Sequence, residues 1–215
     1  MKNSWQILTL LLAISLLCLS IKITILDKEK TVTPLDSTPV DKEAIVLENI
    51  MTRSSVRKYT SQKVEQDKID KLLRAGLAAP TAGNKQPWEL MVITDRKVLD
   101  AIPPIIKGAH MTNKSQLAIA VLGCPAKALV PDYWVQDCSA VTENILLAAH
   151  GMGLGAVWCG AFPEKGTGNV AGMSKLLNLP DGVLTLSIIV IGYPEGEAKI
   201  KDKWDASKIH YNTYN

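Results

Sequence analysis

The chain has 215 residues, of which 47% are hydrophobic and 21% charged, and its formal net charge is +3. This length and apolar fraction suit one domain with a substantial core. The small basic excess, with no basic run interleaved with aromatic residues, argues against a nucleic-acid partner. The four cysteines have neither CxxC spacing nor partnered histidines, which argues against a metal site and a disulfide framework.

An apolar segment opens the chain. Residues 7–21 form a run of fifteen uncharged, mostly apolar residues; Lys22 interrupts the run and residues 23–26 resume it. About twenty such residues cross a bilayer, and no small-residue cleavage site follows. Residues 1–26 are therefore predicted to be a single membrane anchor, with an exported protein after signal cleavage as the alternative. Lysines flank the run on both sides, so its orientation stays open.

The next segment, residues 27–43, is polar and mixed in charge, and it contains Pro34 and Pro39. Such a composition cannot bury enough apolar surface to build a core. We interpret it as a flexible linker and predict the folded domain over residues 44–215.

Hydrophobic patterning predicts the elements of that domain. Helices are expected at residues 44–51, 66–78, 98–106, 134–150 and 170–177. Strands are expected at residues 89–94, 117–123, 156–162 and 185–192. The run 117–123 is apolar throughout, as in a strand buried on both faces. The order of helices and strands is irregular, which favours an α+β or α/β sandwich.

Three glycines at alternate positions, Gly151, Gly153 and Gly155, could suggest a dinucleotide fingerprint. That motif follows a strand and has the spacing GxGxxG, whereas this one follows a helix. We expect these glycines to end the helix and lead tightly into the next strand.

Two short stretches carry the functional signal. Residues 53–59 (RSSVRKY) place two arginines four positions apart around two serines, a pattern that suits phosphate or another anion. Residues 79–88 (APTAGNKQPW) join a predicted helix to a predicted strand through turn-forming residues. Taken singly, the arginines could be ordinary surface charges and the loop an ordinary connection.

Together the two stretches resemble the FMN-dependent nitroreductase family, which combines an Arg-x-Ser-x-Arg/Lys motif with a later Pro-Ser/Thr-x-x-Asn-x-Gln-Pro-Trp loop. The resemblance continues through residues 134–149, 153–162 and 209–212, and it covers about residues 45–215. It implies an α+β fold: an α/β/α sandwich with a central mixed sheet, assembled as an intertwined homodimer.

The resemblance also implies how the cofactor phosphate is held. Arg53 matches the family's phosphate-binding arginine, and Ser54 and Ser55 stand beside it. Lys201 and Lys203 match a basic pair from the C-terminal segment that reaches the same phosphate. Relatives often have arginine at the second of these positions; lysine keeps the charge but lacks the planar fork. The alternative for the lysines is undirected solvated charge in a lysine-rich tail.

The remaining site residues are implied for the flavin ring. Arg57 matches a cation near the ring, and Asn84 matches an asparagine at its polar edge, in a loop shared with Pro80, Thr81 and Gln86. A second segment matches the backbone that passes close to flavin N5: Trp158, Cys159, Gly160 and Ala161. Many relatives have glutamate where Gly160 stands, so this chain departs from the family pattern there and the resemblance leaves the polarity near N5 open.

The implied function is an FMN-dependent oxidoreductase that uses NADH or NADPH to reduce a nitroaromatic, quinone or similar conjugated electrophile by ping-pong hydride transfer. No side chain is expected to act as a catalyst and no metal is expected, because the flavin carries the redox chemistry. The alternative is a membrane-tethered flavin-binding electron carrier or partner module without small-molecule turnover.

Overall fold

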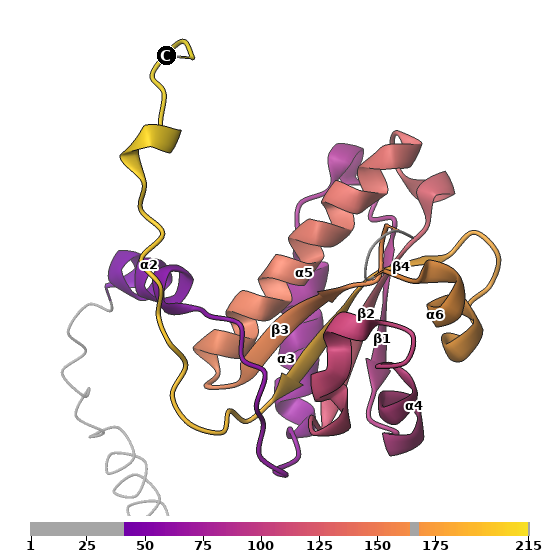
Figure 1. Ribbon diagram of the computed structural model, residues 1–215. Helices are drawn as coiled ribbons and strands as arrows, with labels where there is room; N and C mark the ends of the chain where they lie inside the picture. The colour runs from indigo at the N-terminus through magenta and orange to yellow at the C-terminus, as the bar shows by residue number, and fades with distance from the viewer. Residues whose placement is uncertain (1–40, 164–167, 215) are drawn as a thin grey trace, which may run out of the picture. The chain divides into compact units, whose positions relative to one another are not determined.

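The computed structural model describes residues 41–163 and 168–214, and Glu43–Asn215 form one compact unit (Figure 1). The predicted anchor, residues 1–26, lies outside the described residues, as does nearly all of the predicted linker, residues 27–43.

The predicted membrane location is corrected. Within residues 41–163 and 168–214, no helix is both long and apolar enough to span a bilayer. The apolar segment on which the prediction depended belongs to the residues that the structure does not describe. We therefore retain neither the membrane location nor the membrane as a partner.

A four-stranded sheet forms the centre of the unit. Its strands are β1 (Trp88–Ile93), β2 (Leu117–Gly123), β3 (Gly155–Gly160) and β4 (Leu184–Gly192), in the order β1-β2-β4-β3. Each strand is antiparallel to its neighbours. The expected mixed character is limited, among the described residues, to one parallel bridge between Ser55 and Ala156 at the β3 edge.

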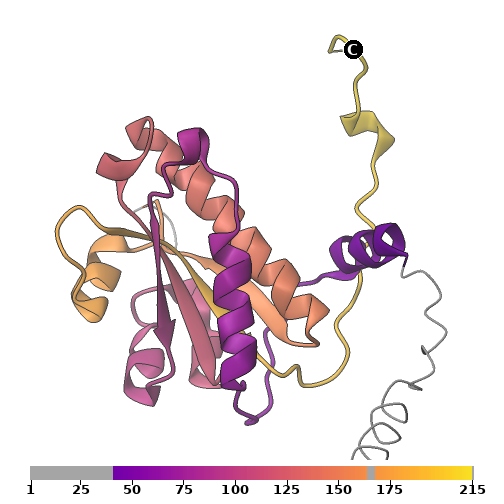
Figure 2. The ribbon, with the colours of Figure 1, turned by 180° about the vertical axis from the view of Figure 1, so that it is seen from behind.

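Helices cover both faces of this sheet. The described α-helices are α2 (Lys42–Thr52), α3 (Gln66–Leu77), α4 (Arg96–Ala101), α5 (Trp134–Gly151) and α6 (Val170–Leu177). The helices α3 and α5 share one core cluster with the sheet, whereas α4 and α6 contribute to a second cluster on the other side (Figures 1 and 2). The arrangement is the predicted α/β/α sandwich.

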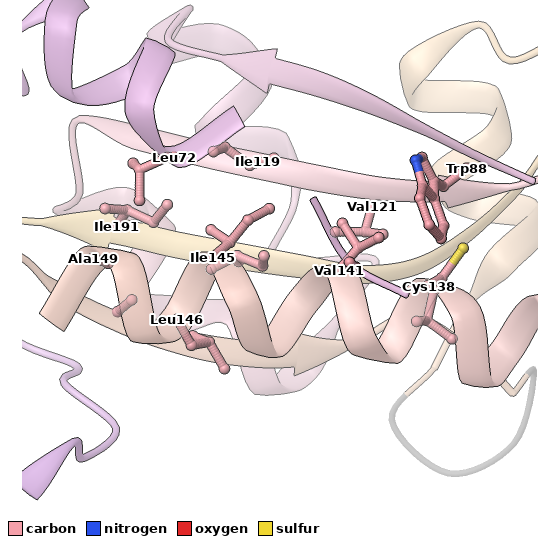
Figure 3. Close-up of a cluster of buried hydrophobic side chains, with 14 of the residues drawn as sticks. Leu72, Trp88, Ile119, Val121, Cys138, Val141, Ile145, Leu146, Ala149 and Ile191 are labelled. Atoms are coloured by element: carbon pink, nitrogen blue, oxygen red, sulfur yellow. The ribbon is translucent and has the colours of Figure 1, made fainter. Parts of the chain in front are cut away.

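The core is built from branched side chains on facing elements. Ile119 of β2, Ile145 of α5 and Ile191 of β4 are fully buried, and Figure 3 shows them in one cluster. Each such side chain stabilises the fold by about 1.5–3 kcal/mol. Gly76 lets α3 approach α5 closely, since a Cβ at this position would lie 2.9 Å from Ile145.

One predicted helix is shorter than expected. The stretch 98–106 is helical only as the end of α4, which stops at Ala101. Ile102 still has helical angles (φ −71°, ψ −47°), but Pro103 and Pro104 follow it, and a proline lacks the backbone donor that continues the helical hydrogen bonds. The chain continues through turns to a 3₁₀ segment, Lys107–Asn113.

The three alternate glycines behave as predicted. Gly151 ends α5, Gly153 adopts a φ of +73°, and Gly155 begins β3. A positive φ is readily accessible to glycine and costly for other residues. Gly155 also allows a close approach, because a Cβ there would lie 2.6 Å from a methyl group of Val56.

Candidate functional site

A pocket of about 430 Å³ opens between the segment Arg53–Lys58 and the start of the C-terminal segment. Six cationic side chains line it against two acidic ones, Glu195 and Glu197. The cations are Arg53, Arg57, Lys58, Lys199, Lys201 and Lys203. Such a cluster suits a dianionic group, because charge-assisted hydrogen bonds to phosphate are the strongest that these side chains make. We call this the cationic pocket.

Backbone hydrogen bonds join the two walls of the cationic pocket. The amide of Thr60 donates to the Tyr193 carbonyl at 2.9 Å, and the amide of Glu195 donates to the Lys58 carbonyl at 3.0 Å. Between them, Tyr59 forms an antiparallel bridge with Pro194. The exit of the chain from β4 is therefore fixed beside the arginine segment, which brings the lysines of the tail to the pocket.

The Tyr59 side chain fixes the segment Arg53–Lys58 to β4. Its hydroxyl is buried, 3.0 Å from the carbonyl oxygen of Val190 and 2.5 Å from that of Val56. Burial raises the pKa of Tyr59 far above its ordinary value, with a smaller contribution from Cys159, and Arg57 opposes the shift. The hydroxyl is thus a permanent donor that holds the segment against β4.

Contacts with α5 orient Arg53. The Arg53 Nε lies 3.5 Å from Oε1 of Glu143, and the side chain is 17% exposed. Just upstream, Asn49 Nδ2 donates to the Leu147 carbonyl at 3.1 Å, and the Thr52 hydroxyl lies 2.8 Å from His150 Nε2. Nε is the inner donor of the guanidinium, so a carboxylate on it leaves the terminal nitrogens for a second acceptor.

The edge strand β3 presents backbone groups beside this segment. The amide of Val56 donates to the Ala156 carbonyl at 3.0 Å, so Ala156 points its backbone groups away from β4. Because backbone groups alternate along an edge strand, Trp158 and Gly160 point theirs outward as well. A Cβ built on Gly160 would meet no described atom nearer than 3.7 Å. Among the described residues, this stretch of the edge is open to a ligand.

Cys159 and Ala161, which alternate with Trp158 and Gly160, are buried in the core. The amide of Ala161 donates to the Leu186 carbonyl at 2.9 Å. The Cys159 thiol is buried, 3.5 Å from the Gly108 carbonyl and 3.8 Å from the Met111 sulfur. Burial raises the pKa of Cys159 to about 11, and the nearby Arg57 partly opposes the shift. Cys159 and Ala161 therefore pack the strand in place rather than meet a ligand through their side chains.

The loop 79–88 has an unusual backbone. Gly83, Asn84 and Gln86 have φ angles of 58°, 53° and 49°, and non-glycine residues rarely adopt such values. Two hydrogen bonds that involve side chains lie within the loop: the Gln86 amide donates to the Thr81 hydroxyl at 3.2 Å, and Gln86 Nε2 donates to Asn84 Oδ1 at 2.9 Å. Two backbone bonds add to them, from the Asn84 amide to the Thr81 carbonyl at 3.1 Å and from the Lys85 amide to the Ala82 carbonyl at 3.2 Å. The bond from the Gln86 side chain occupies Asn84 Oδ1 and leaves the Asn84 Nδ2 donor for another acceptor.

The structure brings together one part of the predicted site and leaves another part separate. The predicted residues that line the cationic pocket are Arg53, Ser54, Ser55, Arg57, Lys201 and Lys203. The predicted residues of the loop are not among those that line it: Pro80, Thr81, Asn84 and Gln86.

Sequence reasoning missed several residues. Lys58 and Lys199 also line the pocket, and each is adjacent or nearly adjacent to a residue that was singled out. Asp137 contacts the loop, and Glu143 contacts Arg53. Both were missed because the sequence analysis considered only the apolar residues of their helix. The signal that could have found them was the presence of two carboxylates on an otherwise apolar helix.

Comparison with known proteins identifies the class. The model of the Nitroreductase family matches residues 50–123 and 130–193, which is more than half of the chain. The chain therefore belongs to the nitroreductase family.

Individual relatives share the fold and much of the sequence. A provisionally named NADH dehydrogenase/NAD(P)H nitroreductase of Methanothermobacter thermautotrophicus is 39% identical over 165 residues, which cover 77% of this chain and 85% of that protein. A crystal structure of a protein with the same provisional name from Parabacteroides distasonis is 42% identical with a TM-score of 0.74, covering 78% of this chain and 98% of that one. An FMN-dependent nitroreductase of Clostridium difficile is 29% identical with a TM-score of 0.71, covering 78% and 99%.

Proposed function

We propose that the protein is an FMN-dependent oxidoreductase that uses NADH or NADPH to reduce a nitroaromatic, a quinone or a similar conjugated electrophile. The observation that carries this proposal is the cationic pocket, where two arginines and four lysines converge beside an open stretch of the β3 edge. FMN, when bound, supplies a hydride acceptor that turns over in ping-pong fashion between the reductant and the second substrate.

The residues of the pocket fit the phosphate of FMN. Glu143 contacts the Nε of Arg53, which leaves the terminal nitrogens for a second acceptor, and Ser54 and Ser55 add hydroxyl donors beside it. Lys201 and Lys203 supply further positive charge from the opposite wall. The excess of cations over acids favours a dianion over a singly charged or neutral ligand.

Different residues are proposed to contact the flavin ring. Arg57 lies close enough to Cys159 to lower its pKa, so its charge reaches the β3 segment as well as the pocket. A cation there stabilises negative charge that develops on a ligand against the strand. The outward backbone groups of Trp158 and Gly160 lie on the same edge and offer donors and acceptors without a side chain at Gly160.

Relatives support the cofactor and the reductant. The C. difficile protein is described as an FMN-dependent nitroreductase, and the M. thermautotrophicus protein carries NAD(P)H nitroreductase in its name. Both are 29% identical or more over at least three quarters of this chain. We extend FMN and a nicotinamide reductant to this chain on that basis.

We also propose that the protein is a homodimer. Many large apolar side chains are exposed in the single chain, on α2 and in the C-terminal segment: Ile45, Val46, Leu47, Ile50, Met51, Ile200, Trp204, Tyr211 and Tyr214. Soluble monomers rarely expose so much apolar surface in continuous stretches. The loop 79–88 lies outside the pocket lining, which supports a site completed by a second copy.

The test is flavin binding followed by turnover. The full chain should retain FMN in equilibrium dialysis and then oxidise NADH or NADPH with a quinone or a nitroaromatic. Parallel lines in double-reciprocal plots would mark ping-pong kinetics. A protein that binds FMN without turnover would instead be a flavin-binding electron carrier, and a protein that binds no FMN would contradict the proposal.

A further inference from the structure

The loop 79–88 has a backbone conformation that needs support from its surroundings. Three residues in the left-handed region, Gly83, Asn84 and Gln86, stand within four positions. Each non-glycine residue in this region costs free energy and persists only where the surroundings fix it. The hydrogen bonds inside the loop tie its members to one another. The ends of the loop are fixed by the Ala79 amide, which donates to the Gly76 carbonyl at 3.1 Å, and by the Pro87 carbonyl, which accepts from the Cys124 amide at 2.8 Å.

A carboxylate from α5 ties the turn in the middle of the loop to the core. Asp137 lies in the first turn of α5 and is 5% exposed. Its Oδ1 accepts a hydrogen bond of 3.0 Å from the amide of Ala82, the first residue of the 3₁₀ turn Ala82–Asn84. The bond therefore fixes the start of the left-handed turn to the helix across 55 positions of the chain.

The other carboxylate oxygen of Asp137 lowers the stability of the fold. Oδ2 of Asp137 is buried and has no hydrogen-bond partner among the residues that the structure describes. A buried acceptor without a partner destabilises a fold, and a carboxylate does so more than a neutral group. The N-terminal position on α5 offsets part of this cost, because the helix dipole favours negative charge there. For fold stability alone, a smaller neutral acceptor would serve the Ala82 amide.

We propose that Asp137 is a positioning residue for ligand binding: it holds the loop so that Thr81 and Asn84 meet the flavin ring. This inference rests on the proposed function, since it takes the ligand to be a flavin. It differs from the role of Glu143, which contacts Arg53 and therefore acts on the phosphate side. The two carboxylates stand six positions apart on α5, about 9 Å along the axis, and serve opposite ends of the ligand.

Comparing FMN with riboflavin separates the two ends, because riboflavin lacks the phosphate. Asp137→Ala should weaken both ligands by about tenfold, within the range for a lost hydrogen bond to a charged group. Asp137→Asn keeps an acceptor for Ala82 and should recover most of the affinity. Glu143→Gln, the matched control on the same helix, should weaken FMN and leave riboflavin unchanged.

A second variant tests the same bond from the other side. Ala82→Pro removes the donor without touching Asp137, and Thr81 already has the extended backbone (φ −145°, ψ 147°) that a residue before proline prefers. It should match Asp137→Ala in its effect on both ligands and in the change of the bound flavin's visible circular dichroism. This variant decides the question if Asp137→Ala fails to fold.

The outcomes are distinguishable from failure of the proposed function. A wild-type chain that binds neither flavin rejects the proposed function itself. A wild-type chain that binds both, with folded Asp137→Ala and Ala82→Pro variants of unchanged affinity, rejects the positioning role. Loss of FMN affinity alone in these two variants would place Asp137 on the phosphate side and would also overturn the inference.

Discussion

Arg53 is the residue on which the proposed phosphate side of the site depends most. It is the most buried of the ion-paired arginines in the described part of the chain, with a side chain 17% exposed, and Glu143 holds its inner nitrogen. Lysine could supply the charge here but could not bind a carboxylate and a phosphate at once through a rigid planar group. We therefore expect arginine chemistry to be required at this position.

Substituting Arg53 by alanine should weaken FMN binding while the fold remains intact. A hydrogen bond to a charged group contributes about 1.5–3 kcal/mol, which corresponds to about 10- to 100-fold in affinity. Equilibrium dialysis with FMN measures the change, and Arg74→Ala, on the exposed side of α3, is the matched control. Equal affinity of the Arg53→Ala variant and the control would reduce Arg53 to a surface charge.

The buried thiols predict how stability depends on alkaline pH. Burial raises the pKa of Cys159 to about 11 and that of Cys138 to about 12, from an ordinary value of 9.0. A group whose pKa is raised on folding stabilises the folded state below its unfolded pKa and loses that contribution as the pH rises through its folded pKa.

The free energy of unfolding should therefore fall from about pH 9 toward pH 11, where Cys159 titrates in the folded protein. Denaturant unfolding at several pH values measures the slope, and Cys159→Ala should make it shallower. If this variant and the wild-type chain show the same alkaline slope, Cys159 is not the group that sets it.

At the scale of elements, sequence periodicity predicted most of the fold. The helix predicted over 170–177 coincides with α6, and the strand over 117–123 coincides with β2, which is buried at every position. Apolar runs bounded by glycine, proline or asparagine carry this information locally. The helix expected at 98–106 was too long. The prediction followed the apolar residues of this stretch, whereas the helix ends at Ala101, before Pro103 and Pro104.

The site was less predictable than the fold. Residues 53–57 and Lys201 and Lys203 could be placed together from their resemblance to a family motif, and the structure brings them to one pocket. Asp137 and Glu143 could not, because their roles depend on which loop and which arginine α5 passes. Such contacts join residues 55 and 90 positions apart, and no local pattern encodes them.

Gly155 lets the strand β3 lie close to the arginine segment of the cationic pocket. A Cβ at this position would lie 2.6 Å from a methyl group of Val56, so Gly155→Ala must push the arginine segment away from β3. Overpacking of this kind costs about 1–3 kcal/mol. We expect lower stability and weaker FMN binding, measured by thermal unfolding and dialysis.

The control for this substitution is Gly108→Ala, where an added Cβ meets no described atom within 4 Å. Both glycines lie outside the positive-φ set, so backbone strain does not distinguish them. Wild-type FMN affinity in a folded Gly155→Ala protein would show that the Val56 contact does not position the pocket.

At the scale of the whole molecule, the C-terminal segment, residues 195–214, is the part whose role the sequence alone predicts least. It is exposed throughout its described length, with Trp204 75% and Tyr214 90% exposed. Such side chains gain about 1.5–3 kcal/mol each when buried, less the cost of ordering them. Among the described residues of the single chain nothing covers these side chains, and we therefore assign them to contacts with a second copy.

A chain truncated after Gly196 should therefore lose both the dimer and the flavin. FMN binding and dimerisation are linked if the ligand stabilises the assembly that completes its site. Lys201→Ala with Lys203→Ala should weaken FMN and leave the dimer intact. Sedimentation and flavin absorbance on the same samples measure both properties, and a truncated chain that stays dimeric and yellow would contradict the assignment.

The most direct measurement of the central claim is an anaerobic spectral titration of the full chain loaded with FMN. Addition of NADH or NADPH should bleach the visible absorbance of the bound flavin, and a quinone or a nitroaromatic added afterwards should restore it. This sequence of colour changes is the expected signature of an oxidoreductase that alternates between a nicotinamide and a second substrate. An absorbance that neither nucleotide changes would contradict the proposed activity.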